Sequence, residues 1–351
     1  MKILVLCLPG LGDALMATPL ISALRKEYPK AVIDVGCMFT AVEYIFKNNK
    51  NVDNVYFLPL YKHNRVMGVL SLLPMRKHGY DVSILAYPAY RREYHIVQWI
   101  MGAKKRIAHN FGHNYWSEFN FLDTDFVKVD EGVHIVINNM NLLGALGIDW
   151  KKKYKPSSLK YDLKLDDSDI EFGNKYIGDL RWRSKIIGLH PGSINSKLGM
   201  MKRWPVERFS ELAKKLIKKG NKILVFVGPD ELDLGRKLMR LIGDRGNVRL
   251  VENMKLNQAL GVLNQVDLLI TNDNGFAHLA NALKKKSIVL YGPTNSLWCR
   301  PYDDRLCKIV RKAKFEPWFR NDMKVENPPP GARSGTEAIE VSDVVSLLKD
   351  F

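Results

Sequence analysis

Residues 3–13 read ILVLCLPGLGD, an apolar run that ends in a glycine-containing turn just before a helical pattern begins. A second stretch of this kind, VDLLITNDNG, occupies residues 266–275 in the other half of the chain. A buried strand that runs through a turn into a helix aims backbone N–H groups at a phosphate. Only the first turn carries the carboxylate Asp13, and a simple phosphate cradle would avoid that negative charge. We therefore expect one half of the chain to bind a phosphate and the other half to perform chemistry.

The same alternation of apolar runs and helical periodicity extends outward from both stretches. It predicts strands at 3–8, 31–36, 55–58, 82–86, 106–108, 186–189, 223–227, 266–270 and 287–291. Runs that are apolar throughout are typical of parallel strands covered on both faces. Helices are expected at 15–28, 133–146, 206–217 and 341–348. Inside the first of these helices, Pro19 should introduce a kink or a restart that Thr18 caps.

These elements predict an α/β protein of two Rossmann-like lobes, with parallel sheets facing a central cleft. The expected boundaries are 1–160 for the N-terminal lobe and 161–335 for the C-terminal lobe, with a polar, lysine-rich crossing at 151–158. A last helical segment, 336–351, is expected to pack back towards the N-terminal lobe. Ligands should bind at the carboxyl ends of the strands.

Composition limits the classes of protein that this chain represents. With 351 residues, 46% of them hydrophobic, it is long enough for two cores and has no apolar run near the roughly 20 residues of a membrane span. Its four cysteines lack CxxC spacing, so we expect reduced thiols in a cytoplasmic protein. The 54 basic and 37 acidic residues give a net charge of +17. This charge favours an anionic partner: nucleic acid, a lipid surface or a phosphorylated substrate.

Two short motifs resemble known sites but fit them poorly. The Gly10–Gly12 turn is not a dinucleotide fingerprint, because the third glycine position is Leu15 and Asp13 would repel a pyrophosphate. Asp123-Thr124-Asp125 is a D-x-D sequence, whose two carboxylates could bind a divalent metal. Its position late in the first half leads us to interpret it as a surface turn and to expect no metal site.

The C-terminal half contains the better candidates for binding a phosphorylated ligand. The helix that opens at Asp273 suits a diphosphate through its N–H groups and its dipole, although Asp273 could instead serve as an N-cap. His278 on this helix could equally be a core histidine. Either Lys202 or Arg203, which precede another helix, could reach a phosphate. Glu231 could accept hydrogen bonds from a nucleoside or simply favour a helix dipole.

Taken in order, these motifs resemble the heptosyltransferase family of glycosyltransferases, which build the inner core of lipopolysaccharide. The resemblance covers residues 1 to about 300 and rests on Gly12-Asp13 with Thr18-Pro19, His190-Pro191-Gly192-Ser193, Lys202-x-Trp204-Pro205, Asp273-x-Gly275-x-x-His278-Leu279-Ala280 and Tyr291-Gly292-Pro293-Thr294. It implies a GT-B fold, a nucleotide sugar in the C-terminal lobe, and inversion at the anomeric carbon without a metal or other cofactor. By the family pattern, Asp13 is the general base and Lys202 neutralises the leaving diphosphate. The implied donor-binding residues are Gly12, Ser193, Glu231, Asp273, Asn274, Gly275 and His278.

The chain departs from the family at Asn274, where Ser or Thr is usual, and in the segment after Leu297. We expect Arg65, Arg91 and Arg92, which follow strands, to bind carboxylates or phosphates of the acceptor. Basic and aromatic residues mix over 300–320 and suit an anionic membrane surface better than nucleic acid.

The sequence therefore predicts transfer of heptose from ADP-heptose to an anionic lipopolysaccharide acceptor at the cytoplasmic face of the inner membrane. The alternatives are a same-fold transferase with another nucleotide sugar and another glycan or protein acceptor, or a non-catalytic nucleotide-sugar or polyanion binding protein.

Overall fold

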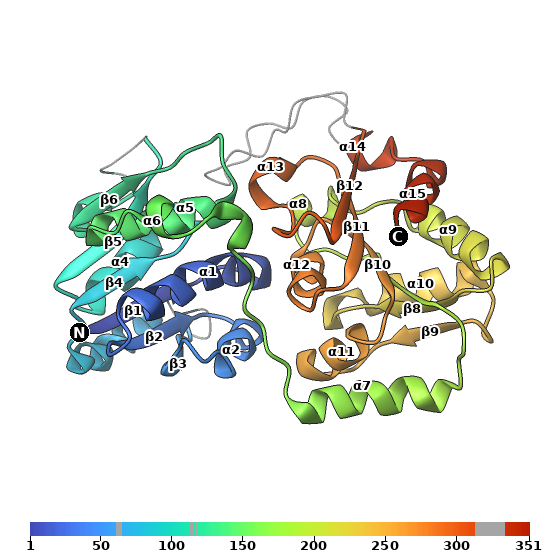
Figure 1. Ribbon diagram of the computed structural model, residues 1–351, viewed down its shortest axis with the longest axis horizontal. Coiled ribbons are helices and arrows are strands. Elements are labelled where there is room, and N and C mark those ends of the chain that lie inside the picture. The colour runs from blue at the N-terminus through green and yellow to red at the C-terminus, as the bar shows by residue number, and fades with distance from the viewer. Residues whose placement is uncertain (61–64, 113–115, 117, 313–333) are drawn as a thin grey trace. The chain divides into compact units, whose positions relative to one another are not determined.

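The computed structural model describes the chain except for residues 61–64, 113–115, 117 and 313–333. It divides into two compact units, residues 1–164 and the part of the chain that follows. Each unit is built on a six-stranded parallel sheet with helices packed against it (Figure 1).

The first unit contains β1 (Lys2–Cys7), α1 (Leu11–Glu27), β2 (Val32–Cys37), α2 (Thr40–Lys47), β3 (Asn54–Phe57), α3 (Arg65–Leu70), η1 (Leu73–His78), β4 (Val82–Leu85), α4 (Arg92–Ile100), β5 (Lys105–Asn110), η2 (Asn120–Leu122), β6 (Asp125–Lys128), α5 (Ile135–Asn141), η3 (Leu142–Leu146), α6 (Trp150–Lys153) and η4 (Pro156–Ser158). The second contains α7 (Asp167–Leu180), β7 (Ile186–His190), α8 (Lys197–Met200), α9 (Val206–Lys218), β8 (Lys222–Phe226), η5 (Pro229–Glu231), α10 (Leu232–Ile242), β9 (Val248–Val251), α11 (Leu256–Leu263), β10 (Leu268–Asn272), α12 (Gly275–Ala282), β11 (Lys286–Tyr291), α13 (Ser296–Cys299), β12 (Cys307–Arg311), α14 (Ser334–Glu337), α15 (Val341–Leu347) and η6 (Leu348–Asp350).

Both sheets have a topological switch point, where the strand order reverses direction. The first sheet runs β3-β2-β1-β4-β5-β6, so its switch point lies between β1 and β4, with Ile3 opposite Val82. The second runs β12-β11-β10-β7-β8-β9, with its switch point between β7 and β10 and Leu268 opposite Ile187. Ligands of open α/β sheets bind at such points, beyond the carboxyl ends of the strands. The fold thus provides one candidate binding edge in each unit.

The predicted parallel strands are confirmed, but three edge or near-edge strands were not predicted from the sequence. These are β6, in which no position is buried, and β9 and β12, which mix buried with half-buried or exposed positions. Strands at the edge of a sheet have fewer covered positions, so they lack the continuous apolar run by which central strands are recognised.

Pro19 does not restart the first helix, because α1 runs without interruption from Leu11 to Glu27. Proline has no N–H to give to the carbonyl of Leu15, four residues earlier. The Thr18 hydroxyl donates to that carbonyl instead, at 2.7 Å. The predicted capping role of Thr18 is therefore wrong, and its side chain repairs the hydrogen bond that the proline removes.

The described part of the C-terminal segment is grouped with the second unit. Helix α15 packs on α9, and Ile339, Val341 and Val344 are buried in the core that covers one face of the second sheet (Figure 1). A sequence pattern cannot assign such apolar contacts to one sheet or the other, and packing of 336–351 towards the first unit stays a prediction.

Candidate active site

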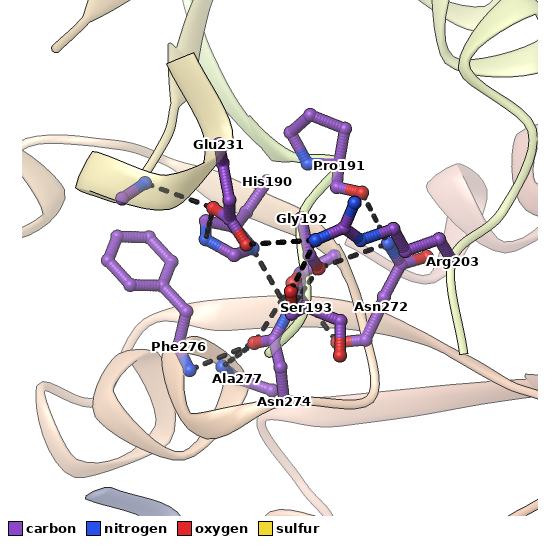
Figure 2. A network of polar contacts seen from close by, with 12 residues as sticks. His190, Pro191, Gly192, Ser193, Arg203, Glu231, Asn272, Asn274, Phe276 and Ala277 are labelled. Atoms are coloured by element: carbon purple, nitrogen blue, oxygen red, sulfur yellow. Dashed lines mark hydrogen bonds and ion pairs between the residues drawn. The ribbon is translucent and has the colours of Figure 1, made fainter. Parts of the chain in front are cut away.

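Asn274 is the centre of a polar network at the switch point of the second sheet (Figure 2). Its side-chain oxygen accepts hydrogen bonds from the N–H groups of Phe276 (2.9 Å) and Ala277 (3.3 Å), which caps helix α12. Two backbone donors on the oxygen fix the orientation of the amide. Its nitrogen donates to the carbonyl of Gly192 at 2.9 Å and to Nδ1 of His190 at 3.0 Å.

This cap corrects two expectations about the start of helix α12. The N–H groups of Phe276 and Ala277 are not free for a phosphate, because Asn274 already accepts both. Asp273 is not the N-cap. It lies one residue earlier and is 4% exposed. What remains for a diphosphate is the positive end of the helix dipole, together with side chains from neighbouring loops.

The hydrogen bonds of His190 fix its tautomer and direct it at Glu231. Since Nδ1 accepts from Asn274, Nε2 carries the proton, and it lies 3.4 Å from Oε2 of Glu231. The His190 ring stacks on Phe276, with centroids 4.7 Å apart. The histidine thus links the loop after β7 to the loop after β8.

Glu231 is a buried carboxylate held in its charged form. Burial by itself raises its pKa, but the hydrogen bonds from His190 and from the N–H of Gly228, with the charge of Arg203, outweigh burial and lower it. Position 192 in the neighbouring loop must be glycine, because a Cβ on Gly192 would lie 2.0 Å from Oε1 of Glu231. The close approach of backbone to carboxylate explains the glycine of the His-Pro-Gly-Ser motif.

Lys202 and Asp273 form a buried ion pair beside this network. Nζ of Lys202 lies 2.8 Å from Oδ2 of Asp273, and the two side chains are 17% and 5% exposed. His278 lies close enough to this ion pair for both charges to shift its pKa. The pKa of His278 is lowered to about 4, mainly by burial and also by the charge of Lys202. The charge of Asp273 and a hydrogen bond to the Cys299 backbone act in the opposite direction. The histidine is therefore neutral near pH 7 and lies inside the unit, so its part in donor binding stays a prediction.

Asn272 was not assigned a role from the sequence, and Arg203 was predicted only as an alternative to Lys202 for reaching a phosphate. Asn272 donates to the carbonyl of Pro191 (2.8 Å) and accepts from the N–H of Trp204 (3.0 Å), which ties the two loops together. Arg203 donates to the carbonyl of the buried Ser193 at 2.6 Å and reaches Glu231 at 4.0 Å. Both residues border motifs quoted from the sequence, and that adjacency was the only signal available.

In the first unit, Asp13 lies half-buried in the first turn of α1, next to Gly12. The turn starts at Gly10, the N-cap, whose carbonyl accepts from Ala14. The charge of Asp13 reaches the buried Cys7 thiol, whose pKa is raised by burial first, then by Cys37 and Asp13. Gly12, assigned above to donor binding, thus lies in a different unit from the other donor-binding candidates.

Two of the candidate acceptor-binding arginines, Arg91 and Arg92, follow β4, the strand beside β1, whereas Arg65 follows β3. Arg91 and Arg92 are exposed, and the Arg91 guanidinium lies 5.9 Å from the centre of the Tyr90 ring. Arg65 is the first residue of α3, and its side chain is outside what the structure describes. The switch point of the first unit thus has the loop of Asp13 on one strand and the loop of Arg91 on its neighbour.

The D-x-D sequence is not the surface turn that we expected. Asp123 is buried, with Oδ2 only 2.5 Å from Nδ1 of His95, whereas Asp125 pairs with Lys105 at 3.1 Å. The partner His95 lies 28 positions away, so no local pattern could have revealed it. Within the described ranges, no three His, Cys, Asp or Glu side chains gather as a metal site would require.

The basic segment 300–320 is only partly described, since residues from 313 onwards lie outside. Four of its described cations pair with carboxylates: Arg300 with Asp304, Arg305 with Asp303, Lys308 with Asp350 and Lys312 with Asp343. These pairs reduce the free positive charge expected there. Among the helices that the structure describes, none combines the length and hydrophobicity needed to cross a bilayer.

Two α/β units, each built on a sheet of parallel strands with polar residues at its switch point, are the architecture of the GT-B class of glycosyltransferases. The solved structure of Escherichia coli ADP-heptose LPS heptosyltransferase II has a TM-score of 0.77 at 22% identity, over 100% of this chain and 98% of that one. A family 9 glycosyltransferase structure from Veillonella parvula has a TM-score of 0.82 at 21% identity, over 99% and 96%. The family model of glycosyltransferase family 9 (heptosyltransferase) matches residues 76–327. The chain belongs to this family, which confirms the resemblance and the GT-B fold inferred from the sequence.

Individual relatives match over unequal lengths. Lipooligosaccharide heptosyltransferase 2 of Haemophilus influenzae is 30% identical over 134 residues, 37% of this chain and 38% of the relative. Lipopolysaccharide heptosyltransferase 1 of Campylobacter coli is 24% identical over 365 residues, 100% of this chain and 99% of the relative. The more identical matches, at 28–30%, span only 36–46% of their relatives' lengths.

Proposed function

We propose that this protein transfers heptose from ADP-heptose to an anionic lipopolysaccharide inner-core acceptor, with inversion and without a metal ion. The observation that carries the proposal is the network at the β7/β10 switch point, where Asn274, His190 and Glu231 are mutually oriented beside the Lys202–Asp273 pair. A structurally similar E. coli heptosyltransferase, with a TM-score of 0.70, was solved with ADP. The donor assignment rests on that likeness and on the chemistry of these side chains.

At the donor, the difficult event is the departure of a diphosphate. Lys202 and the positive end of helix α12 supply charge stabilisation for the leaving group. Asp273 holds the lysine ammonium in place through the 2.8 Å ion pair. Glu231, which is kept ionised, accepts hydrogen bonds from a ribose hydroxyl or the adenine amino group.

At the acceptor, the attacking hydroxyl must lose its proton. The Asp13 carboxylate takes that proton while the hydroxyl oxygen forms a bond to the anomeric carbon. The bond from that carbon to the diphosphate breaks, and its electron pair leaves with ADP. Attack opposite the leaving group inverts the configuration. Arg91 and Arg92 bind carboxylate or phosphate groups of the acceptor bidentately.

The proposal includes a cytoplasmic location and peripheral contact with the inner membrane, where a lipid-anchored acceptor is found. The net charge of +17 supports attraction to an anionic leaflet.

The test combines the purified protein with ADP-heptose and a heptose-less lipopolysaccharide, and follows the acceptor mass. One added heptose is expected with wild type in excess chelator. Asp13→Asn, which keeps the size and removes the base, should lower turnover by roughly 10²–10⁴-fold while calorimetry shows unchanged ADP binding.

The other outcomes distinguish the alternatives. Binding of ADP-heptose without transfer to any inner-core acceptor would favour a different acceptor or a non-catalytic binding protein. Binding of UDP- or GDP-sugars in its place would favour a different donor. Turnover lost in chelator and restored by manganese would refute the metal-independent mechanism.

A further inference from the structure

His95 and Asp123 form a buried pair in the first unit that the proposed chemistry does not use. Nδ1 of His95 on α4 lies 2.5 Å from Oδ2 of Asp123, which follows η2, and the two side chains are 1% and 0% exposed. The other ring nitrogen, Nε2, lies 3.0 Å from the carbonyl oxygen of Ala89. Both nitrogens of one ring thus face oxygen atoms.

The hydrogen bonds of the His95 ring fix how many protons the His95–Asp123 pair holds. A carbonyl only accepts, so Nε2 must carry a hydrogen that it donates to Ala89. The contact between Nδ1 and Asp123 requires a second hydrogen, on either the ring or the carboxyl group. The pair is therefore neutral as a whole, either imidazolium with carboxylate or imidazole with carboxylic acid. A neutral, fully hydrogen-bonded pair avoids the cost of an isolated buried charge.

The carbonyl that the pair holds belongs to the loop after β4, which carries two of the candidate acceptor-binding arginines. Ala89 is fully buried, and the N–H of Tyr87 in the same loop donates to Oδ1 of Asn139 at 2.9 Å. Arg91 follows Ala89 by two positions and is exposed. The loop is thus fixed from inside by two side chains while its arginine faces solvent.

We propose that His95 and Asp123 are a positioning pair that holds the 86–91 loop in the conformation that binds the acceptor. This inference rests on the proposed function of Arg91. It assigns a role to the D-x-D sequence that is different from metal binding: Asp123 orients a histidine, whereas Asp125 makes a partly exposed ion pair with Lys105 and accepts from the Thr124 hydroxyl.

The proposal is tested by Asp123→Asn beside Asp123→Leu. In Asp123→Asn the amide nitrogen donates to Nδ1 of a neutral ring, so Nε2 still donates to Ala89. We expect the acceptor KM to stay within about threefold of wild type. Asp123→Leu leaves Nδ1 without a partner, and the acceptor KM should rise by roughly tenfold or more, the size expected when a buried hydrogen bond is broken. The Kd for ADP should not change in either variant, and Asp125→Asn should behave like wild type.

A second readout does not depend on turnover. Hydrogen exchange followed by mass spectrometry should show faster exchange in the peptide 86–92 of Asp123→Leu, and not in Asp123→Asn or at 273–278. If Asp123→Leu does not fold, the smaller polar variant Asp123→Ser replaces it.

The results separate the possible failures. Loss of activity in Asp123→Asn and Asp125→Asn alike, rescued by manganese, would establish metal binding and overturn the proposal. Equal effects of Asp123→Leu on ADP binding and on the acceptor KM, with exchange faster throughout the unit, would make the pair merely structural. The expected exchange pattern in a protein that transfers no heptose would retain the positioning pair and refute only the proposed function.

Discussion

The switch points of the two sheets are built in opposite ways. In the second unit, His190 links the half-buried Asn274 to the buried Glu231, and Lys202 and Asp273 pair with side chains 17% and 5% exposed. In the first unit, Asp13 is half-buried in a glycine turn and the two arginines beyond β4 are exposed. The support for that loop lies inside, in the His95–Asp123 pair.

The side chains at the second switch point are therefore already oriented by one another. At the first switch point, the loop is held from inside while its arginines are exposed. Groups that are oriented before binding lose little freedom when a ligand arrives, which favours tight and specific recognition. Exposed arginine side chains lose conformational entropy when they bind a ligand. Their guanidinium groups match both carboxylates and phosphates. We infer that the second unit discriminates between nucleotide sugars more strictly than the first discriminates between acceptors.

The largest effect is expected from breaking the buried ion pair. Lys202→Gln leaves Asp273 charged and unpaired, at a cost of roughly 2–5 kcal/mol, and it removes the charge that stabilises the diphosphate. The Kd for ADP should rise and kcat fall, each by about tenfold or more, as measured by calorimetry and initial rates.

A double variant separates charge from catalysis at this pair. Adding Asp273→Asn to Lys202→Gln removes the uncompensated charge, so thermal stability should recover while kcat does not. Full activity in the single Lys202→Gln variant would show that the pair is only structural.

A smaller effect should come from the backbone of the organised site. Gly192→Ala places a Cβ 2.0 Å from Glu231, so the carboxylate must move and ADP binding should weaken by roughly tenfold or more, consistent with an overpacking cost of about 1–3 kcal/mol. Gly228→Ala is the matched control, because its Cβ would lie 3.6 Å from the same carboxylate.

Gly10→Ala extends this test to the first unit. Its nearest neighbour would be Oδ2 of Asp13 at 3.9 Å, and the backbone of Gly10 is extended, so folding and ADP binding should be unchanged. Equal loss of ADP binding in the alanine variants of Gly10 and Gly192 would contradict the difference between the two switch points.

The sequence predicted what depends on local pattern. Apolar runs identified the central strands and the two turns, and the motif order identified the family. Asn274 shows where local reasoning ends. The family pattern implied that it binds the donor, but no local pattern showed that it caps its own helix and bonds to His190, 84 positions away. Asp123 was misread for the same reason, since its partner is contributed by another element of the tertiary fold.

The smallest effect is expected where the C-terminal segment meets the donor-binding loops. A Cβ on Gly292 would lie 2.7 Å from Cγ2 of Thr336, whose hydroxyl donates to the carbonyl of Arg203 at 3.3 Å. The segment is also held by Trp204, which donates to the carbonyl of Ile339 at 2.9 Å. Gly292→Ala should therefore push the segment away from the turn of Lys202 and raise the Kd for ADP by roughly threefold.

Thr336→Ser removes only the methyl group that clashes, so it provides a rescue. The double variant Gly292→Ala with Thr336→Ser should bind ADP like wild type, because the next contacts of the new Cβ are 3.4 Å and 3.6 Å away and the serine retains the hydroxyl. Calorimetry should measure the Kd for ADP of wild type, of the two single variants and of the double variant, which together form a double-mutant cycle. If Thr336→Ser fails to restore binding in the double variant, the C-terminal segment does not position Lys202, and the organisation of the second switch point is confined to the loops after β7, β8 and β10.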